Sequence, residues 1–482
     1  MSMEIERRIL RLLHGHKTRT QLREIHGHFL RHHLHQSNQI LSHFVSVCAS
    51  SNKLSYASTL FQHSPNPNIL LFNSIIKAFS LHPPFHNAIH FFSLMRNRGV
   101  WPNEFTFSPL LKACSNILDF RLGQGVHGEV VVMGFQCFSK IRFGLVELYC
   151  KCGRMEDARK VFDEMFNRDV IVWNLMVYGF CKTGDVELGL RYFRGMTERT
   201  VVSWNSMISG LAQCGWDSEA MKLFQEMRNE GFDPDEATVV IILPICARLG
   251  DDHGVGEWIH SYAKSSGLFM DFISVGNSLI DYYCKRGCLE RAFSVFGDMP
   301  RKNVVSWNAM ISGQAFNGNG ERGIDLFDEM INEHGVTPND ATFVGALTCC
   351  SHAGLVKRGG ELLSSMVSDY GIHPKLEHYG CMVDLLGRGG CVKEAYDLTK
   401  VMPFKPNAAI WGSLLNACRH FDDIELAVLA AKELIKVEPW NSGNYILLSN
   451  LYAEKGQWNE VENIRLLMKK NSLQKEPGQS MV

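Results

Sequence analysis

Residues with catalytic chemistry are present in this sequence, but they do not combine into a site. His127 and Glu129 match the His-x-Glu half of a zinc deaminase, in which the histidine binds the metal and the glutamate transfers protons. The Pro-Cys-x-x-Cys half of that motif is found nowhere in the chain. The cysteines lack the paired spacing of a zinc site, and no phosphate-binding loop or Ser–His–Asp set can be assembled. We therefore expect no enzyme activity, no bound metal, no cofactor and no small-molecule substrate.

The composition is that of a folded chain without a dominant charge. The 482 residues include 49 Lys and Arg against 50 Asp and Glu, so no general basic field signals a nucleic acid. Hydrophobic residues make up 45% of the chain, which is enough for a large core. No apolar run approaches the ~20 residues of a membrane span, so we expect no membrane association through a spanning helix. Fifteen cysteines without a secretory signal favour a reducing compartment and free thiols.

One polar side chain recurs at a fixed place within an apolar phrase. An asparagine ends each of the phrases ILLFN, VIVWN and VVSWN, and VVSWN occurs twice. The intervals between these asparagines combine units of 31 residues with units of 35 to 37 residues. The sequence is therefore a repeat of mixed period, and the recurring asparagines are Asn73, Asn174, Asn205 and Asn308.

A second phrase predicts the elements that carry these asparagines. Fifteen residues after each asparagine, a small residue, a phenylalanine and a methionine follow at spacings i, i+4 and i+7, as in Ala88, Phe92 and Met95. These spacings place the three side chains on one face of a helix. A glycine such as Gly184 separates this helix from the preceding one, and the longer units end in Gly-x-x-Pro, where a helix must stop. Each unit therefore reads as two helices joined by a turn.

A helical hairpin of this size cannot bury its apolar stripe alone, whereas stacked hairpins form a continuous core. The sequence therefore predicts an all-α solenoid of helix-turn-helix repeats with a concave surface. Residues 1–37 are expected to be a targeting sequence or a partial repeat, residues 408–476 two further helical hairpins, and residues 477–482 a tail. The eleven expected repeats are 38–68, 69–103, 104–138, 139–169, 170–200, 201–235, 236–272, 273–303, 304–339, 340–375 and 376–407.

The chain resembles the plant pentatricopeptide-repeat (PPR) proteins of the mixed-length PLS class. The resemblance covers essentially the whole chain. Similarity to the final repeats and extension (E) motifs of that family is found in LTCCSHAGLVKRG (347–359), HYGCMVDLLGRGG (378–390), AAIWGSLLNACR (408–419) and NSGNYILLSNLYA (441–453). It implies a right-handed α-solenoid that binds single-stranded organellar RNA. It also implies a site-recognition factor for C-to-U RNA editing, with a deaminase-bearing protein docked on the C-terminal extension.

The resemblance also implies which residues read the RNA. In this family one repeat reads one base with two or three side chains, chiefly its fifth and last residues. An asparagine amide carries a donor and an acceptor on one plane, which suits the edge of a pyrimidine. The family code then implies A for the first pair below, C for pairs of two asparagines, and U for Asn205 with Asp235. The pairs are Ser42/Asn68, Asn73/Asn103, Asn174/Thr200, Asn205/Asp235, Asn277/Asn303 and Asn308/Asn339.

Read from the 5′ end, the expected RNA site is A, C, blank, blank, pyrimidine, U, blank, C, C, blank, blank. The blanks include the repeats with Ser108 and Phe143 at the fifth position. The resemblance further assigns two weaker sets of contacts. Apolar residues three positions before an asparagine would clamp the bases, namely Leu70, Ile171, Val202 and Val305; cations at the turn would meet phosphates, namely Lys151, Lys182 and Lys285.

Other readings of these residues stay open on the sequence. The asparagines could satisfy backbone amides of the early helix, whereas Trp173, Trp204 and Trp307 are expected in the core. A splicing, transcript-processing or RNA-stabilising factor would use the same surface. A tetratricopeptide-like scaffold for peptides would instead require a steady period of ~34 residues, which the alternation of 31 and 35 opposes. We expect a mitochondrial protein, with the chloroplast as the alternative compartment.

Overall fold

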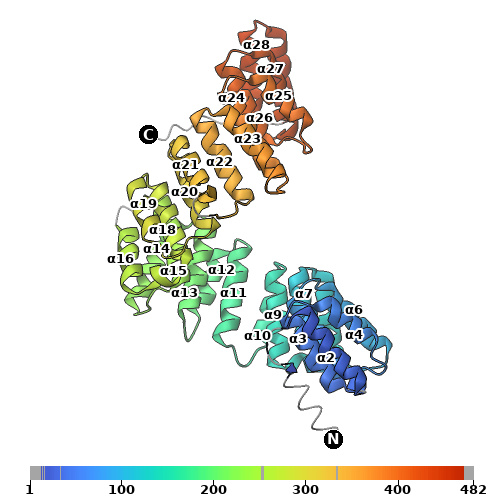
Figure 1. The fold of residues 1–482 in the computed structure, drawn as a ribbon. Coiled ribbons are helices and arrows are strands. Elements are labelled where there is room, and N and C mark those ends of the chain that lie inside the picture. Colours follow the sequence, from blue (N-terminus) through green and yellow to red (C-terminus); the bar gives the residue numbers. More distant parts are fainter. Residues whose placement is uncertain are drawn as a thin grey trace. The chain divides into compact units, whose positions relative to one another are not determined.

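The protein is built from α-helices, as expected. A computed structural model describes residues 12, 13, 15, 17–32, 34–250, 254–332 and 335–471, and these form 28 α-helices and two short 3-10 helices without any β-strand (Figure 1). Residues 1–11 of the possible targeting segment and the tail 477–482 lie outside the described residues. In the part of the chain that is described, no helix has both the length and the apolarity needed to cross a membrane.

The chain divides into two compact units, one up to Asp233 and one from Pro234. In the first unit the helices pair as hairpins, and the proposed repeats from 38 onward each begin on the first residue of a helix. The helices of this unit are α2 (Arg19–Arg31), α3 (Asn38–Ser50), α4 (Leu54–Gln62), α5 (Ile69–Leu81), α6 (His86–Asn97), α7 (Glu104–Ile117), α8 (Phe120–Val132), α9 (Ser139–Lys151), α10 (Met155–Asp163), α11 (Val170–Lys182), α12 (Val186–Arg194), α13 (Val201–Gln213) and α14 (Asp217–Asn229), with 3-10 helices η1 (Leu34–Gln36) and η2 (Phe135–Cys137).

The second unit continues the same pattern of hairpins. It also contains the two hairpins of the C-terminal extension, α26 with α27 and α28 with α29. Its helices are α15 (Glu236–Leu249), α16 (Val255–Ser265), α17 (Leu268–Asp271), α18 (Ile273–Lys285), α19 (Leu289–Asp298), α20 (Val304–Phe316), α21 (Gly320–Asn332), α22 (Asp340–Ala353), α23 (Val356–Ser368), α24 (Leu376–Arg388), α25 (Val392–Val401), α26 (Ala408–His420), α27 (Ile424–Val437), α28 (Ser442–Glu454) and α29 (Trp458–Lys470).

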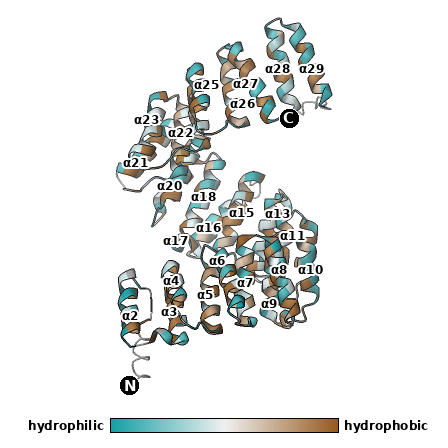
Figure 2. Ribbon diagram, turned by 90° about the vertical axis from the view of Figure 1, so that its right-hand side faces the viewer, coloured by the Kyte–Doolittle hydropathy of each residue, from teal (hydrophilic) through white to brown (hydrophobic). Residues whose placement is uncertain are grey.

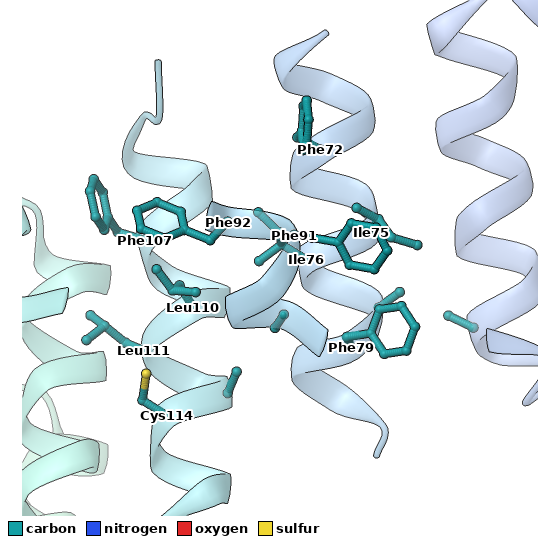
Figure 3. Packing of buried hydrophobic residues seen from close by; sticks show 14 of the residues in the cluster. Phe72, Ile75, Ile76, Phe79, Phe91, Phe92, Phe107, Leu110, Leu111 and Cys114 are labelled. Carbon is teal, nitrogen blue, oxygen red and sulfur yellow. The ribbon is translucent and has the colours of Figure 1, made fainter. Parts of the chain in front are cut away.

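Stacking of the first helices generates the core of each unit. Helix α5 contacts α3 and α7, its counterparts in the neighbouring hairpins, as well as its own partner α6. Figure 3 shows Phe79 of α5 against Phe91 of α6, with ring centroids 5.6 Å apart, and Phe92 beside Phe107 of α7. Apolar and polar residues share the hairpin helices of both units, so each helix has one face for the core and another for water (Figure 2).

The two predicted signatures are core residues. Ala88, Phe92 and Met95 are buried together on α6, and Trp204 and Trp307 are 0% and 1% exposed. The turn between the two helices of many hairpins contains a left-handed glycine, such as Gly153 with φ 69° and Gly318 with φ 77°. In other hairpins Asn52, Leu118 or Asp422 takes this conformation. The buried helix face and the glycine turns that predicted the hairpins are therefore both present in the structure.

A small residue lets adjacent first helices approach closely. A Cβ added to Gly313 of α20 would fall on Sγ of Cys284 in α18 and lie 2.8 Å from its Cβ. We expect Gly313→Ala to destabilise the protein by about 1–3 kcal/mol, because this contact cannot relax without shifting a helix. Urea unfolding measures the change. Gly360→Ala is the control, since Gly360 lies in α23 with open space around it and should gain a few tenths to about 1 kcal/mol of stability.

Candidate nucleic-acid interface

The first unit contains a cavity of about 980 Å³ that brings predicted site residues together. It is formed by α5, α7 and α9, the first helices of three consecutive hairpins, together with the residues just before them. The predicted base-reading residues Asn73 and Asn103 and the predicted clamp Leu70 all line it. Its walls combine amide groups, apolar side chains and lysines, which is the combination that a base, a sugar and a phosphate require.

The fifth and last residues of two repeats are joined by a hydrogen bond. Nδ2 of Asn73 donates to Oδ1 of Asn103 over 3.0 Å, and in the second unit Nδ2 of Asn308 donates to Oδ1 of Asn339 over 3.1 Å. These fifth-position asparagines therefore contact the last residue of their own repeat, which directly precedes the next hairpin, rather than cap their own helices. Thirty or more residues separate the partners in the chain, so only the stacking of repeats brings them together.

The last residues of several repeats have a second contact, because they precede the next helix. The side-chain oxygens of Asn68, Asp235, Asn303 and Asn339 each accept a hydrogen bond from the backbone amide three residues on, as N-caps do. Thr200 forms a capping box with Ser203 at the start of α13. The capping interpretation therefore applies to the last residue of a repeat and not to its fifth.

The other predicted residues lie in different local environments. The hydroxyl of Ser42 is buried and donates to the carbonyl of Gln39 in its own helix. The Oδ1 atoms of Asn174 and Asn277 are buried and have no hydrogen-bond partner among the described residues. Asn205 is buried in α13 of the first unit, whereas Asp235 belongs to the second.

The predicted base clamps form a recurring set of exposed apolar residues. Leu70, Ile171, Val202 and Val305 are 46–60% exposed, although the residue that follows each of them in its helix is buried. They all occupy the second residue of a first helix. Isolated exposed apolar side chains need no explanation, but the same exposed position in repeat after repeat indicates a contact surface.

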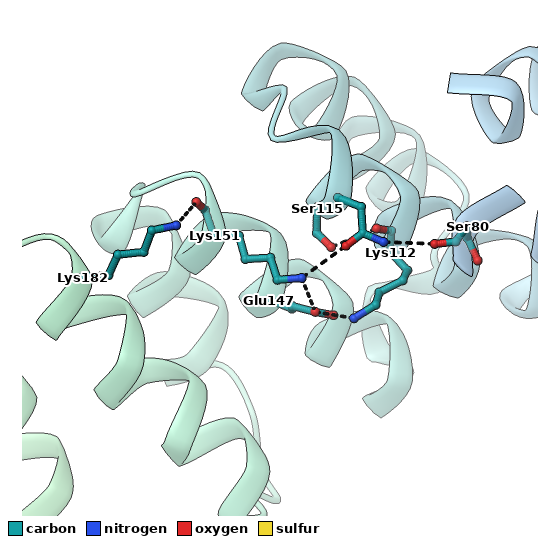
Figure 4. A network of polar contacts seen from close by, with 7 residues as sticks. Ser80, Lys112, Ser115, Glu147, Lys151 and Lys182 are labelled. Carbon is teal, nitrogen blue, oxygen red and sulfur yellow. Dashed lines mark hydrogen bonds and ion pairs between the residues drawn. The ribbon is translucent and has the colours of Figure 1, made fainter. Parts of the chain in front are cut away.

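The predicted phosphate contacts are engaged within the protein. Lys151 pairs with the buried Glu147 over 3.0 Å and donates to Asn116, while Lys182 donates to the carbonyl of Lys151 (Figure 4). Burial raises the pKa of Glu147, but hydrogen bonds from Lys112 and Lys151 outweigh this and leave that pKa below its ordinary value. The third predicted lysine, Lys285, pairs with Asp281 over 2.7 Å.

The cavity also has lining residues that sequence reasoning missed. Lys77 and Lys140 are exposed at its wall and form no ion pair within the described residues. Phe105 is 61% exposed and Phe138 is 44% exposed, and Phe143 completes an aromatic side of the cavity. Phe105 is the second residue of its helix, as Leu70 is, so the repeat pattern could have predicted it as a base clamp. The pattern could not have predicted that the three rings line one cavity.

The histidine of the incomplete deaminase motif has a structural contact. Nδ1 of His127 lies 2.6 Å from the hydroxyl of Tyr149, and the equivalent pairs His26 with Tyr56 and His260 with Tyr283 are both 2.8 Å apart. The pairs of His127 and His260 join one hairpin to the first helix of the next, whereas His26 of α2 contacts α4, the second helix of the α3–α4 hairpin. Among the described residues, no group of three His, Cys, Asp or Glu side chains is arranged to hold a metal ion.

Burial lowers the pKa of His127, although the nearby Glu164 and Asp157 oppose this shift. The unfolded chain therefore binds a proton at a higher pH than the folded chain, near the ordinary value of about 6.5. The neutral ring contributes its full stability above that pH, and we expect the contribution to be lost as the pH falls below it. The midpoint of urea unfolding at pH 7.5 and pH 5.5 measures this loss, which should be smaller in His127→Gln; an equal loss in both proteins contradicts the assignment.

Comparison with known proteins identifies the family. The chain is 58% identical over 480 residues to the pentatricopeptide repeat-containing protein At1g09190 of Arabidopsis thaliana, with 100% of this chain and 99% of the relative aligned. The chain belongs to the pentatricopeptide-repeat family. This PPR protein matches the family models described as PPR repeat family over 67–116, 199–248 and 302–352, PPR repeat over 144–170, 171–201, 277–304 and 377–405, and E motif over 421–482. The expected family and its extension-motif subgroup are confirmed.

Two further similarities agree with the PPR assignment. The pentatricopeptide repeat-containing protein At2g20540 of Arabidopsis thaliana is 42% identical over 480 residues, covering 99% of this chain and 89% of the relative. Among solved structures, the PPR protein PPR10 from maize is similar with a TM-score of 0.51 and 17% identity, covering 95% of this chain and 70% of that one. This likeness of fold confirms the solenoid of helix-turn-helix repeats.

Proposed function

We propose that this PPR protein binds single-stranded RNA through the base-reading residues of its repeats and is not itself an enzyme. The observation that carries the proposal is the cavity between α5 and α9. There the hydrogen-bonded Asn73 and Asn103 lie with the exposed apolar Leu70 and Phe105 and the cations Lys77 and Lys140. The amide pair can form hydrogen bonds with the edge of a base, the apolar side chains can stack on its faces, and the lysines can pair with the adjacent phosphates.

The neutral net charge agrees with such binding because the cations are placed locally. RNA affinity depends on how many phosphates the protein neutralises and not on its total charge. Lys77 and Lys140, which are exposed at the cavity wall, supply such cations in the first unit. A peptide-binding scaffold would have no use for a recurring pair of amides between exposed apolar residues.

Filter binding with purified protein tests the proposal. The probe is an eleven-nucleotide RNA carrying the expected A, C, U and C positions, flanked by unstructured nucleotides, and the control is the same composition in scrambled order. We expect tighter binding of the first RNA, and a lower affinity for both as salt rises. Equal affinity for both sequences, or no binding of either, contradicts sequence-specific RNA recognition and favours the scaffold.

We further propose that the bound RNA is an organellar transcript in which one cytidine is edited to uridine. The E motif over 421–482 supports this, since the resemblance links the extension motifs to editing. Relatives of Arabidopsis thaliana that are 33% and 35% identical are named chloroplastic and mitochondrial respectively, which supports an organelle as the compartment, and our proposal is the mitochondrion. Sequencing of organellar transcripts from a plant without this protein should reveal the loss of editing at one or a few sites. Intact editing with missing splice products or shortened ends would favour splicing or processing instead.

The extension offers a face on which a deaminase-bearing partner could dock. Trp440, between α27 and α28, is 70% exposed, and its loop is held by hydrogen bonds from Asn441 to Glu438 and from Tyr445 to the carbonyl of Pro439. An exposed tryptophan on a rigid loop has the properties of an interface anchor.

We expect Trp440→Ala to abolish editing in a complemented plant and to leave the RNA dissociation constant unchanged. Phe166→Ala is the matched control, because Phe166 is 97% exposed and lies outside the extension. Normal editing with Trp440→Ala would show that this face does not recruit the partner.

A further inference from the structure

Two threonines complete a hydrogen-bonded triad around the base-reading asparagines. Oγ1 of Thr106 lies 2.6 Å from Oδ1 of Asn73 and 3.1 Å from Oδ1 of Asn103. In the second unit, Oγ1 of Thr342 lies 2.7 Å from Oδ1 of Asn308 and 3.0 Å from Oδ1 of Asn339. Both threonines are fully buried and occupy the third residue of the helix that begins the next repeat.

A third pair of asparagines has the same residue types but no triad. Asn277 and Asn303 occupy the fifth and last positions of the repeat 273–303, and the third residue of the next helix is Ser306. The hydroxyl of Ser306 contacts Oδ1 of Asn303 at 3.2 Å, whereas Oδ1 of Asn277 is buried without a partner among the described residues. Asn174, followed by Ser203 in the same register, has the same unpartnered oxygen.

The difference follows from the side chain at the third position. The methyl group of threonine restricts rotation about χ1 and holds the hydroxyl in one direction, whereas a serine hydroxyl is not held in this way. We propose that Thr106 and Thr342 are positioning residues that orient the amides of Asn73 and Asn308 for cytosine and against uracil. The proposal rests on the RNA-binding function proposed above and adds a third residue, from the following repeat, to the choice of base.

The triad determines which groups are left for the base. Oδ1 of Asn308 is occupied by the threonine hydroxyl, and one Nδ2 hydrogen is occupied by Asn339. Oδ1 of Asn339 already accepts from Asn308 and from the amide of Thr342, which turns its own Nδ2 away from these partners. The groups that remain are N–H donors. Cytosine presents acceptors at N3 and O2, whereas uracil presents a donor at N3, so a pair that offers only donors favours cytosine.

Without the threonine hydroxyl the amide of Asn308 can rotate and offer its oxygen to the N3–H of uracil. The first test is Thr342→Val, which removes the hydroxyl and keeps the shape of the side chain. Affinity is measured for RNAs with C or U at the ninth position of the predicted site, which faces the repeat 304–339. We expect the preference for C over U at that position to fall about 3- to 10-fold, the effect of one hydrogen bond. The preference at the eighth position, which faces Asn277 and Asn303, should not change in the same protein.

The second test is Ser306→Thr, which should raise the preference for C at the eighth position by a similar factor. Thermal melting of each variant shows whether the N-cap of the helix is damaged, since the backbone amide of Asn339 also donates to the hydroxyl of Thr342. If the residue had a purely structural role, its replacement would lower the melting temperature and would change the affinities for the C and U RNAs equally. An unchanged ratio of C to U affinities in Thr342→Val, or in Ser306→Thr, overturns the positioning role. If the wild-type protein binds neither RNA, the proposed function itself fails, which is a separate result from binding without a change in preference.

Discussion

Replacement of Asn308 by alanine is expected to weaken binding of the cognate RNA about 10- to 100-fold, the range for loss of a specific base contact worth ~1–3 kcal/mol. Asn308 is half-buried in α20, and its amide contacts Asn339, the last residue of its own repeat, and Thr342 of the next repeat. Its removal leaves the hydroxyl of Thr342 within 3.0 Å of Oδ1 of Asn339, so the helix start of α22 keeps its cap. The stability of the fold should therefore change little.

Filter binding and thermal melting of the same protein preparation separate the two effects. Asn332→Ala is the matched control, because Asn332 is an exposed asparagine at the end of α21 and lies away from the triad. Asn205→Ala is a weaker test, since Asn205 is only 7% exposed and its loss affects packing as well. A lower melting temperature with unchanged RNA affinity would show that Asn308 is structural.

The second large effect concerns the core of the repeats. Trp307→Ala is expected to destabilise the protein by about 3–5 kcal/mol, the usual cost of deleting a buried aromatic side chain. Trp307 is 1% exposed and packs edge-on against Phe296 of the preceding hairpin, with ring centroids 4.8 Å apart. Because each repeat of a solenoid is stabilised by its neighbours, the loss should extend beyond the hairpin that carries Trp307.

Urea unfolding followed by circular dichroism measures this loss, and a broadened or two-step transition would be its signature in a stacked array. Phe316→Ala serves as the control, because Phe316 ends the same helix but is 70% exposed. A change below about 1 kcal/mol for Trp307→Ala would contradict its role as core, since surface substitutions fall within that range.

Much of the fold followed from local pattern. The spacing of Ala88, Phe92 and Met95 predicted a helix face that is buried, and glycines such as Gly153 and Gly184 predicted turns, where the backbone is left-handed. These features depend on the periodicity of a helix and on the backbone preferences of single residues, which the sequence states directly.

The candidate site was predictable only in part. The exposed clamps follow from the repeat, because Leu70 and Val305 share one helix position and one environment. The lysines did not follow, since Lys151 has the position of a phosphate contact but lies against the buried carboxylate of Glu147. The sequence shows that a residue is charged, but it does not show which ion-pair partner the fold places beside it.

The sequence by itself determined that this is an all-α array of paired helices, where its first helices begin, and which side chains recur at the fifth and last positions. Only the tertiary structure decided that Asn73 meets Asn103 and Thr106, that the same asparagine pair at Asn277 and Asn303 is not joined, and that Phe105, Phe138 and Phe143 surround one cavity. The physical reason is distance along the chain. These groups lie about thirty residues apart or come from different hairpins, so their contacts depend on how closely neighbouring repeats pack and on the rotamers that this packing allows.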